Sequence, residues 1–180
     1  MKVALTGGIA CGKSLLSKFL NELGVETLDA DDVVHTLLPD PEERRRIAAE
    51  VFADPEKRKE LEARLHPIVK ERIDEWIEGP GVRVAIIPLL FEAHWEKNFD
   101  IICCVASSRE TQIERMIATR GMSRAEAEAR LAAQLPVEEK ARRSHYVIRN
   151  DGTAEELKAQ AAAFLKFVTQ KQMQPKLPND

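Results

Sequence analysis

The sequence lacks the features of a membrane protein and of a strongly charged nucleic-acid binder. No run of apolar residues approaches the ~20 that a membrane-spanning helix needs, and the formal net charge is only −3. So small an imbalance offers no electrostatic reason for the whole chain to bind nucleic acid or a membrane. The apolar run at the N-terminus is too short for a signal peptide. We therefore predict a cytoplasmic protein with neither nucleic-acid nor membrane partners, as a monomer or a weak homo-oligomer.

Cysteine and histidine are scarce, and neither is spaced for a metal. The three cysteines, Cys11, Cys103 and Cys104, form no C-x-x-C pair. This is the pattern of a reduced, intracellular protein. The histidines show no metal-ligand spacing among themselves, so a zinc site is not supported. They are His35, His66, His94 and His145.

A phosphate-binding motif stands near the N-terminus. Residues 7–14 read G-G-I-A-C-G-K-S, which fits G-x-x-x-x-G-K-S, the P-loop. A short apolar run precedes the motif, and apolar residues recur at helical spacing after it, which disfavours a chance match. In such a loop the backbone N–H groups surround the phosphates of ATP. Lys13 would reach the β- and γ-phosphates, and the Ser14 hydroxyl would bind Mg²⁺.

Short apolar segments alternate with helical ones along the chain, which predicts an α/β fold: a P-loop NTPase-type parallel sheet flanked by helices. We expect one kinase-like domain over residues 1–170 and a disordered tail at 171–180. Strands are expected at 2–5, 25–28, 82–90, 101–106 and 146–148. The domain divides into a core (1–31, 82–108 and 144–170), a helical insertion (32–81) and a helical lid (109–143). Within the insertion, His66-Pro67 is expected to separate two helices.

Two acidic residues follow predicted strands, where ligands bind in parallel sheets. Asp31 would lie near the γ-phosphate, where phosphoryl transfer needs a group that orients the acceptor hydroxyl and accepts its proton. The alternative is capping of the next helix, which Asp29, Asp31 or Asp32 could each provide. For Glu92 two placements stay open. Its carboxylate would lie near Mg²⁺ or the acceptor, or it would be a solvated loop residue. Pro88 stands where many P-loop proteins have the Walker B aspartate, which argues against a motor-type ATPase.

Positive charge gathers in residues 109–149, which hold nine Arg or Lys and six Glu. Most of these cations fit a solvated, salt-bridged helical face. Arg120 differs, because it precedes Gly121-Met122-Ser123, a helix break followed by a serine cap. An arginine at such a hinge is a candidate for closing on phosphates. For His66 a capping or core role is favoured over a substrate contact.

With these motifs in view, the sequence resembles the dephospho-CoA kinase family over about residues 1–165. The similarity is distributed along the chain, which makes it more specific than a P-loop alone. The matching segments are Leu5–Ile9, Gly12–Ser14, Leu23-Gly24, Asp29–Asp31, Arg44, Val51-Phe52, Leu61-Glu62, His66-Pro67, Pro88–Glu92, Arg115, Arg120-Gly121, Arg130, Gln134, Val147-Ile148, Asn150 and Gly152.

The resemblance implies transfer of the ATP γ-phosphate to the ribose 3′-hydroxyl of dephospho-CoA, with Mg²⁺, as the last step of coenzyme A synthesis. It implies that Asp31 orients or deprotonates that hydroxyl, helped by Lys13 and Arg120. The acceptor would contact Asp31, His66, Leu90 and Glu92, and the helices of residues 32–81 would hold it. The residues implied to bind ATP are Gly8, Ile9, Ala10, Cys11, Gly12, Lys13, Ser14, Leu15 and, beside the adenine, Asn150.

The chain departs from the family pattern at several positions. Ala10-Cys11 replaces the usual Gly-Ser, so a positive φ at Ala10 would be costly. The stretch between Leu38 and Arg44 is shorter than in the family, which trims the acceptor-binding helices. Cys11, beside Lys13 at a helix N-terminus, is either a reactive thiol or a packed side chain. A nucleoside or nucleotide kinase is the alternative enzyme, and a regulatory ATP-binding protein is the alternative outside catalysis.

Overall fold

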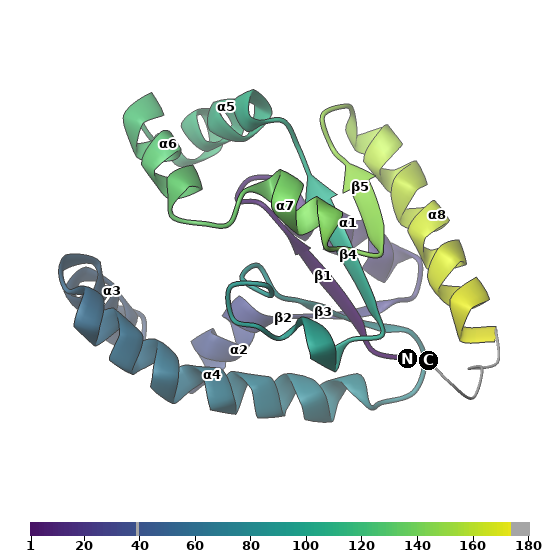
Figure 1. The fold of residues 1–180 in the computed structure, drawn as a ribbon, viewed down its shortest axis with the longest axis horizontal. Coiled ribbons are helices and arrows are strands. Elements are labelled where there is room, and N and C mark those ends of the chain that lie inside the picture. The colour runs from purple at the N-terminus through teal and green to yellow at the C-terminus, as the bar shows by residue number, and fades with distance from the viewer. Residues whose placement is uncertain (39, 174–180) are drawn as a thin grey trace.

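Five parallel strands form one sheet in the order β2-β3-β1-β4-β5 (Figure 1). This computed structural model describes residues 1–38 and 40–173, without the side chains of residues 48, 49, 51–53, 55, 58, 59 and 62. The strands are β1 Val3–Gly7, β2 Glu26–Asp29, β3 Arg83–Ile86, β4 Ile101–Ala106 and β5 Tyr146–Arg149. The α/β parallel sheet predicted from the sequence is confirmed.

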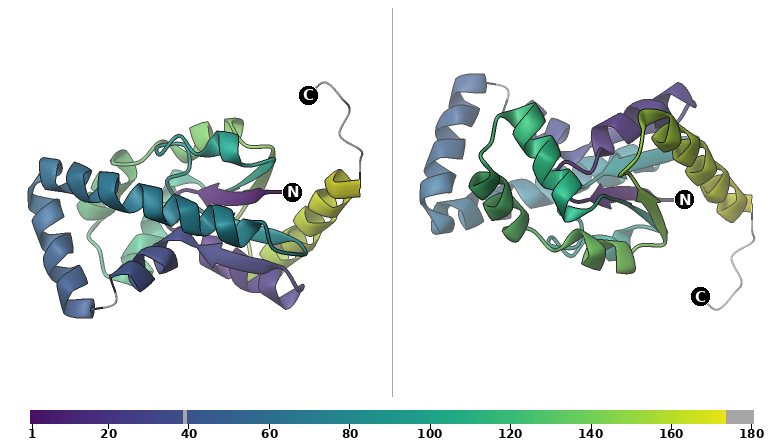
Figure 2. Two further views of the ribbon diagram at one scale, coloured as in Figure 1. Left: turned by 90° about the horizontal axis from the view of Figure 1, so that it is seen from below. Right: turned by 90° about the horizontal axis from the view of Figure 1, so that it is seen from above.

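Helices cover both faces of the sheet, as buried parallel strands require. On one face α1 and α8 pack against alternate residues of β1 and β4, and on the other α2, α4 and α7 pack against the residues between them. Figure 2 shows this layering from above and below. The helices are α1 Lys13–Glu22, α2 Ala30–Leu37, α3 Pro41–Ala53, α4 Pro55–Ile77, α5 Arg109–Arg120, α6 Arg124–Ala132, α7 Val137–Arg142 and α8 Ala154–Met173, with a 3₁₀ turn η1 at Glu96–Asn98.

The third strand is shorter than the sequence predicts. An apolar strand was expected over residues 82–90, but β3 ends at Ile86. One further ladder bond follows, in which Ile87 N donates to Leu5 O at 2.8 Å. Pro88 then has no N–H to donate, and the chain turns back on itself, with Leu90 N donating to Ile87 O. The apolar residues after Ile86 therefore pack in a turn rather than in the sheet.

The expected break at His66-Pro67 is absent, because α4 runs unbroken from Pro55 to Ile77 with Pro67 inside it. Proline removes one intrahelical hydrogen bond. Burial of the helix face offsets this loss, since Val69, Ile73 and Ile77 are all buried against the sheet.

The C-terminal boundary also differs from the prediction. The last helix begins with a reciprocal cap between Thr153 and Glu156, as the T-x-x-E pattern indicates. It continues to Met173, three residues into the predicted tail, and residues 174–180 lie outside the described part of the chain. Within the described residues, no helix is long and apolar enough to cross a membrane.

Two helical pairs extend from the carboxyl ends of the strands. The α3–α4 pair and the α5–α6 pair lie on either side of the loop that follows β1 (Figure 1). The α5–α6 pair has a tight corner, where Gly121 adopts a left-handed φ of 63° and Ser123 caps α6 in a capping box with Glu126. The corner after α5 and the serine cap match the helix break expected there.

Gly7→Ala should be much more destabilising than Gly24→Ala. Both glycines have a positive φ, 147° and 83° respectively, so either alanine carries backbone strain of about 1–2 kcal/mol. A Cβ at Gly7 would in addition lie 2.2 Å from the Val105 carbonyl oxygen, whereas a Cβ at Gly24 meets nothing within 4 Å. We expect Gly7→Ala to lose at least about 3 kcal/mol in urea unfolding. Equal losses in the two variants would contradict this.

Candidate active site

The phosphate loop joins the end of β1 to the start of α1 in a strained backbone. Gly12 caps α1 with a left-handed φ of 94°. Ala10 also has a positive φ, 57°, which for a residue with a Cβ costs about 1–2 kcal/mol. The strain expected at this position is therefore present. Such strain persists only where the surroundings hold the backbone in place.

Three side chains hold three consecutive carbonyls of this loop. The amide of Gln112 donates to Ile9 O at 2.7 Å, and the guanidinium of Arg115 donates to Ala10 O at 3.3 Å. The amide of Asn150 donates to Cys11 O at 2.8 Å. These three hydrogen bonds fix the loop backbone, and within the loop Cys11 N donates to Gly8 O at 3.4 Å. A fixed turn of this kind is the backbone from which anion-binding nests are built.

The three holding residues are themselves linked. The Arg115 guanidinium also donates to Asn150 O at 2.8 Å and to the Ser107 hydroxyl at 3.1 Å. The Ser107 hydroxyl in turn donates to Asn150 O at 2.7 Å. Asn150 was expected beside the adenine of ATP. Its buried side chain binds the loop backbone, and its place beside the adenine stays a prediction.

Lys13 lies over the loop and close to several charges. Its ammonium donates to Gly7 O at 3.2 Å and to Gly8 O at 2.9 Å. Desolvation lowers the pKa of Lys13, and the positive charge of Lys140 lowers it further, while the carboxylates of Asp29 and Asp31 raise it. The end of β2 and the start of α2 therefore lie near the phosphate loop, as the parallel sheet predicts.

Asp29, not Asp31, caps helix α2. The carboxylate of Asp29 accepts a hydrogen bond from Asp31 N at 3.0 Å. Burial raises the pKa of Asp29, and the charges of Asp31 and Asp32 raise it further. Asp31 is exposed in the first turn of α2, so its side chain is not the cap. Of the three aspartates that could cap this helix, Asp29 is the one that does. The carboxylate of Asp31 is therefore free of the cap and exposed to solvent.

Glu92 forms an ion pair with a buried lysine that the sequence did not single out. Lys140 is 0% exposed, and its ammonium lies 2.8 Å from the Glu92 carboxylate. The ammonium also donates to Pro88 O at 2.8 Å, and Glu92 accepts a hydrogen bond from Leu135 N at 3.0 Å. Glu92 is thus a partly buried, ion-paired residue rather than a solvated loop residue, and its second carboxylate oxygen has no hydrogen-bond partner among the described residues. Its contact with the acceptor stays a prediction. The burial of Lys140 could have been inferred from helical spacing, because Lys140 lies three residues after Val137 and next to Ala141 on the inward face of α7.

The other residues predicted from the sequence lie in different surroundings. Leu90 is fully buried in the core, so its side chain does not face a ligand. His66 packs edge-on against Trp95, with ring centroids 5.6 Å apart. Arg120 is exposed at the end of α5, and Leu15 is 38% exposed on the first turn of α1.

Cys11 is fully buried, and burial raises its pKa despite the nearby charge of Lys13. The reactive-thiol hypothesis is therefore wrong, because a reactive thiol needs exposure and a lowered pKa. Burial also raises the pKa of Cys104 to about 12 and holds the pKa of Cys103 well above its usual value.

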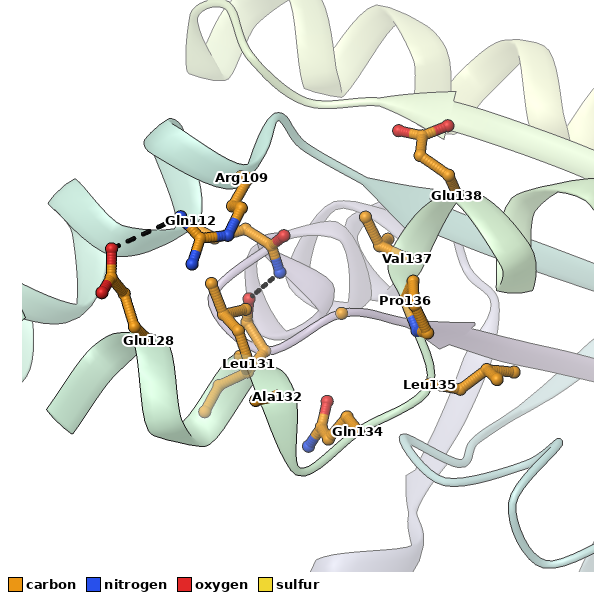
Figure 3. Close-up of a pocket in the computed structure, with 12 residues that line it drawn as sticks. Arg109, Gln112, Glu128, Leu131, Ala132, Gln134, Leu135, Pro136, Val137 and Glu138 are labelled. Atoms are coloured by element: carbon orange, nitrogen blue, oxygen red, sulfur yellow. Dashed lines mark hydrogen bonds and ion pairs between the residues drawn. The ribbon is translucent and has the colours of Figure 1, made fainter. Parts of the chain in front are cut away.

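A cavity of about 390 Å³ adjoins the start of the phosphate loop (Figure 3). Helix α5, helix α6 and the connection to α7 surround it. Its lining is mostly apolar and consists of Gly8, Ile9, Arg109, Gln112, Glu128, Leu131, Ala132, Gln134, Leu135, Pro136, Val137 and Glu138. No cluster of three metal-ligating side chains occurs among the residues that the structure describes.

The sequence matches a family of kinases over most of its length. The model of the dephospho-CoA kinase family matches residues 1–43 and 42–156. A dephospho-CoA kinase of Geobacter sulfurreducens is 41% identical over 182 residues, which cover 86% of this chain and 92% of that protein. One of Symbiobacterium thermophilum is 38% identical over 187 residues, which cover 89% of this chain and 78% of that protein.

Solved structures share the fold. A Thermus thermophilus protein superposes with a TM-score of 0.75 at 34% identity, covering 92% of this chain and 96% of that chain. A dephospho-CoA kinase of Campylobacter jejuni gives a TM-score of 0.70 at 24% identity, covering 95% and 98%. A shikimate kinase of Acinetobacter baumannii gives 0.66 at 16%, covering 96% and 94%. The last two likenesses concern the fold alone.

Lys140→Met should lower the free energy of unfolding by about 2–4 kcal/mol, because it leaves the Glu92 carboxylate without its cation. Adding Glu92→Gln should recover part of that loss, so the two effects are not additive. Arg142→Met is the matched control: Arg142 is an exposed neighbour with a local partner, Glu139, and its loss should stay within about 0.5 kcal/mol. Urea unfolding measures the parent, Lys140→Met, Glu92→Gln, the double variant and the Arg142→Met control. Strict additivity would contradict a coupled pair.

The three thiols should be inert in the folded protein. Raised pKa values mean that less thiolate is present at a given pH than for a free cysteine. At about pH 8, near the ordinary thiol pKa, we expect no rapid reaction with a thiol-exchange reagent. Concentrated guanidinium should release all three thiols. Rapid native labelling of Cys11, mapped by mass spectrometry, would contradict its burial.

Proposed function

The chain belongs to the dephospho-CoA kinase family and is an ATP-dependent kinase of dephospho-CoA, and we propose that the transfer takes place between Lys13 and Asp31. The reaction moves the γ-phosphoryl group of ATP to the ribose 3′-hydroxyl and yields coenzyme A and ADP. It is the final step of coenzyme A biosynthesis. The observation that carries the proposed location is the parallel pairing of β1 and β2 with β3, which brings the phosphate loop after β1 and Asp31 after β2 to the same carboxyl edge of the sheet.

The phosphate loop binds and orients ATP. Its N–H groups and the N-terminus of α1 attract the phosphates, and the Lys13 ammonium neutralises charge on the β- and γ-phosphates. The ammonium now donates to Gly7 O and Gly8 O, so these two hydrogen bonds are exchanged for phosphate contacts on binding. The buried network behind the loop keeps the loop from reorganising during transfer, which is what electrostatic preorganisation requires.

Asp31 orients the acceptor hydroxyl and accepts its proton. Two observations support this role. Its carboxylate is exposed and is not used as the helix cap, which Asp29 provides. It also lies close enough to Lys13 to raise the pKa of that group. A base in this position meets the hydroxyl where the γ-phosphate is held.

Mg²⁺ is the metal that this chemistry calls for, and the residues present fit it. Mg²⁺ in kinase sites is held by one or two protein oxygens together with phosphates and waters. The Ser14 hydroxyl, at the first turn of α1 directly after Lys13, is the protein ligand we propose. When bound, the ion would offset the negative charge of the phosphates.

The two helical pairs supply the remaining contacts. Arg120 is exposed at the end of α5, and its proposed role is to contact the phosphates when the α5–α6 pair closes. Helices α2 to α4 and His66 hold the acceptor. The cytoplasmic location and the monomeric or weakly oligomeric state stay predictions from the sequence.

The activity itself is tested by incubating the protein with ATP and dephospho-CoA and measuring the mass of the acceptor. Addition of one phosphoryl group, with equimolar ADP, is the expected result. A panel of nucleosides and nucleotides in parallel separates this activity from that of a nucleotide kinase. ATP binding without transfer to any acceptor would identify a regulatory ATP-binding protein instead.

Asp31→Asn should lower single-turnover transfer by about 10²–10⁴, the usual span for a general base. ATP affinity should stay near that of the parent, because the phosphate loop is untouched. The matched control is Asp32→Asn, which removes another exposed carboxylate one residue away. We expect the control to retain turnover within about threefold. An Asp31→Asn rate within the same threefold range would remove Asp31 from the mechanism.

A further inference from the structure

The cavity beside the phosphate loop adjoins the first residues of that loop. Gly8 and Ile9 form part of its wall, whereas Gly12 to Leu15, where α1 begins, do not line it. In a P-loop the phosphates run along the helix N-terminus, so the nucleoside of ATP extends beyond α1. On this reasoning the cavity lies on the acceptor side of the transferred phosphoryl group, and Figure 3 shows the residues of α5, α6 and the connection to α7 that surround it.

The charged groups that line this cavity are already paired. Arg109 lies 3.4 Å from Glu128, and Glu138 lies 2.6 Å from Arg149. The amide of Gln112 donates to Ile9 O. Most of the remaining wall is apolar: Ile9, Leu131, Ala132, Leu135, Pro136 and Val137. A diphosphate entering here would meet two carboxylates and cations that are already neutralised, whereas an uncharged ring system would meet apolar side chains.

The chemistry of the acceptor limits what can occupy this space. The reacting 3′-hydroxyl of dephospho-CoA belongs to a ribose that carries an adenine base on one side and a diphosphate on the other. One of these two groups must lie beside the phosphate loop when the hydroxyl meets the γ-phosphate. The paired charges and apolar wall match the base, and the volume of about 390 Å³ is in the usual range of small-molecule sites.

We propose that this cavity binds the adenine base of dephospho-CoA, with the side-chain amide of Gln134 recognising the edge of the base. An amide can donate to N7 and accept from the exocyclic amine of adenine in a bidentate pair. Gln134 stands in the connection between α6 and α7, beside Leu135, whose N–H is held by Glu92. The ion pair of Glu92 with Lys140 thus positions the segment that reads the base. This inference rests on the proposed function.

Filling the cavity tests the location. Ala132 lines the cavity and is exposed, and the next residue, Ala133, is also exposed but is not among the lining residues. Ala132→Phe should raise KM for dephospho-CoA at least about tenfold and leave KM for ATP within about twofold. Ala133→Phe should leave both within that twofold range. Circular dichroism confirms that both variants are folded.

Changing the base tests the recognition. The parent should prefer dephospho-CoA over its analogue with hypoxanthine, which lacks the exocyclic amine, by at least about fivefold in kcat/KM. Gln134→Leu should bring that ratio to within about twofold of one, because the remaining wall cannot distinguish the two bases. A merely structural role of Gln134 would lower both values and leave their ratio unchanged, which would overturn the assignment.

The outcomes separate this inference from the proposed function. Failure of the parent protein to phosphorylate dephospho-CoA would overturn the function itself. Normal transfer with KM for dephospho-CoA unchanged in Ala132→Phe would overturn only the base pocket. A rise in KM for ATP instead would assign the cavity to the base of ATP and equally overturn the inference.

Discussion

Three consecutive carbonyl groups of the phosphate loop are held by side chains from outside the loop, and the rest of the site depends on where these carbonyls point. The carbonyls of residues 9, 10 and 11 accept hydrogen bonds from the side chains of Gln112, Arg115 and Asn150, respectively. This holds the loop backbone in place and maintains the left-handed conformation at Ala10. Because an alanine replaces the glycine usual at that position, the loop relies on these external hydrogen bonds to offset the strain.

The positive charges of Lys13 and Lys140 are accompanied by nearby carboxylates. Lys140 is fully buried and pairs with Glu92. Asp29 ends strand β2, and Asp31 lies in the first turn of the helix that follows. A buried lysine without a carboxylate would repel both Lys13 and any further cation, so the Glu92 partner is needed for the site to tolerate it. The same pair also holds Leu135, and through it the connection from α6 to α7. Electrostatic balance and the shape of the cavity therefore have a common origin.

The two helical pairs differ in how they are attached. Helix α4 packs along the sheet through buried residues, so the proposed acceptor-binding helices share the core. The α5–α6 pair instead packs through a small cluster of its own, in which Ile113, Met116 and Ala127 are buried and Ile9 and Ala10 of the phosphate loop pack against them. Exposed ion pairs, such as Arg124 with Glu110, add little to this attachment. The buried cluster therefore attaches the pair to the phosphate loop rather than to the sheet.

What the sequence by itself determined were features that depend on neighbours in the chain. The P-loop, the alternating strands and helices, the serine cap at Ser123 and the cap between Thr153 and Glu156 all follow from spacings of a few residues. The resemblance to a kinase family, now confirmed, rests on the same local motifs. Only the tertiary structure decided which side chains meet from distant parts of the chain. The bond from Asn150 to Cys11 spans 139 residues, and the one from Gln112 to Ile9 spans 103. Burial likewise changed the interpretation of Cys11, Leu90 and Glu92, because whether a side chain is solvated depends on what packs over it.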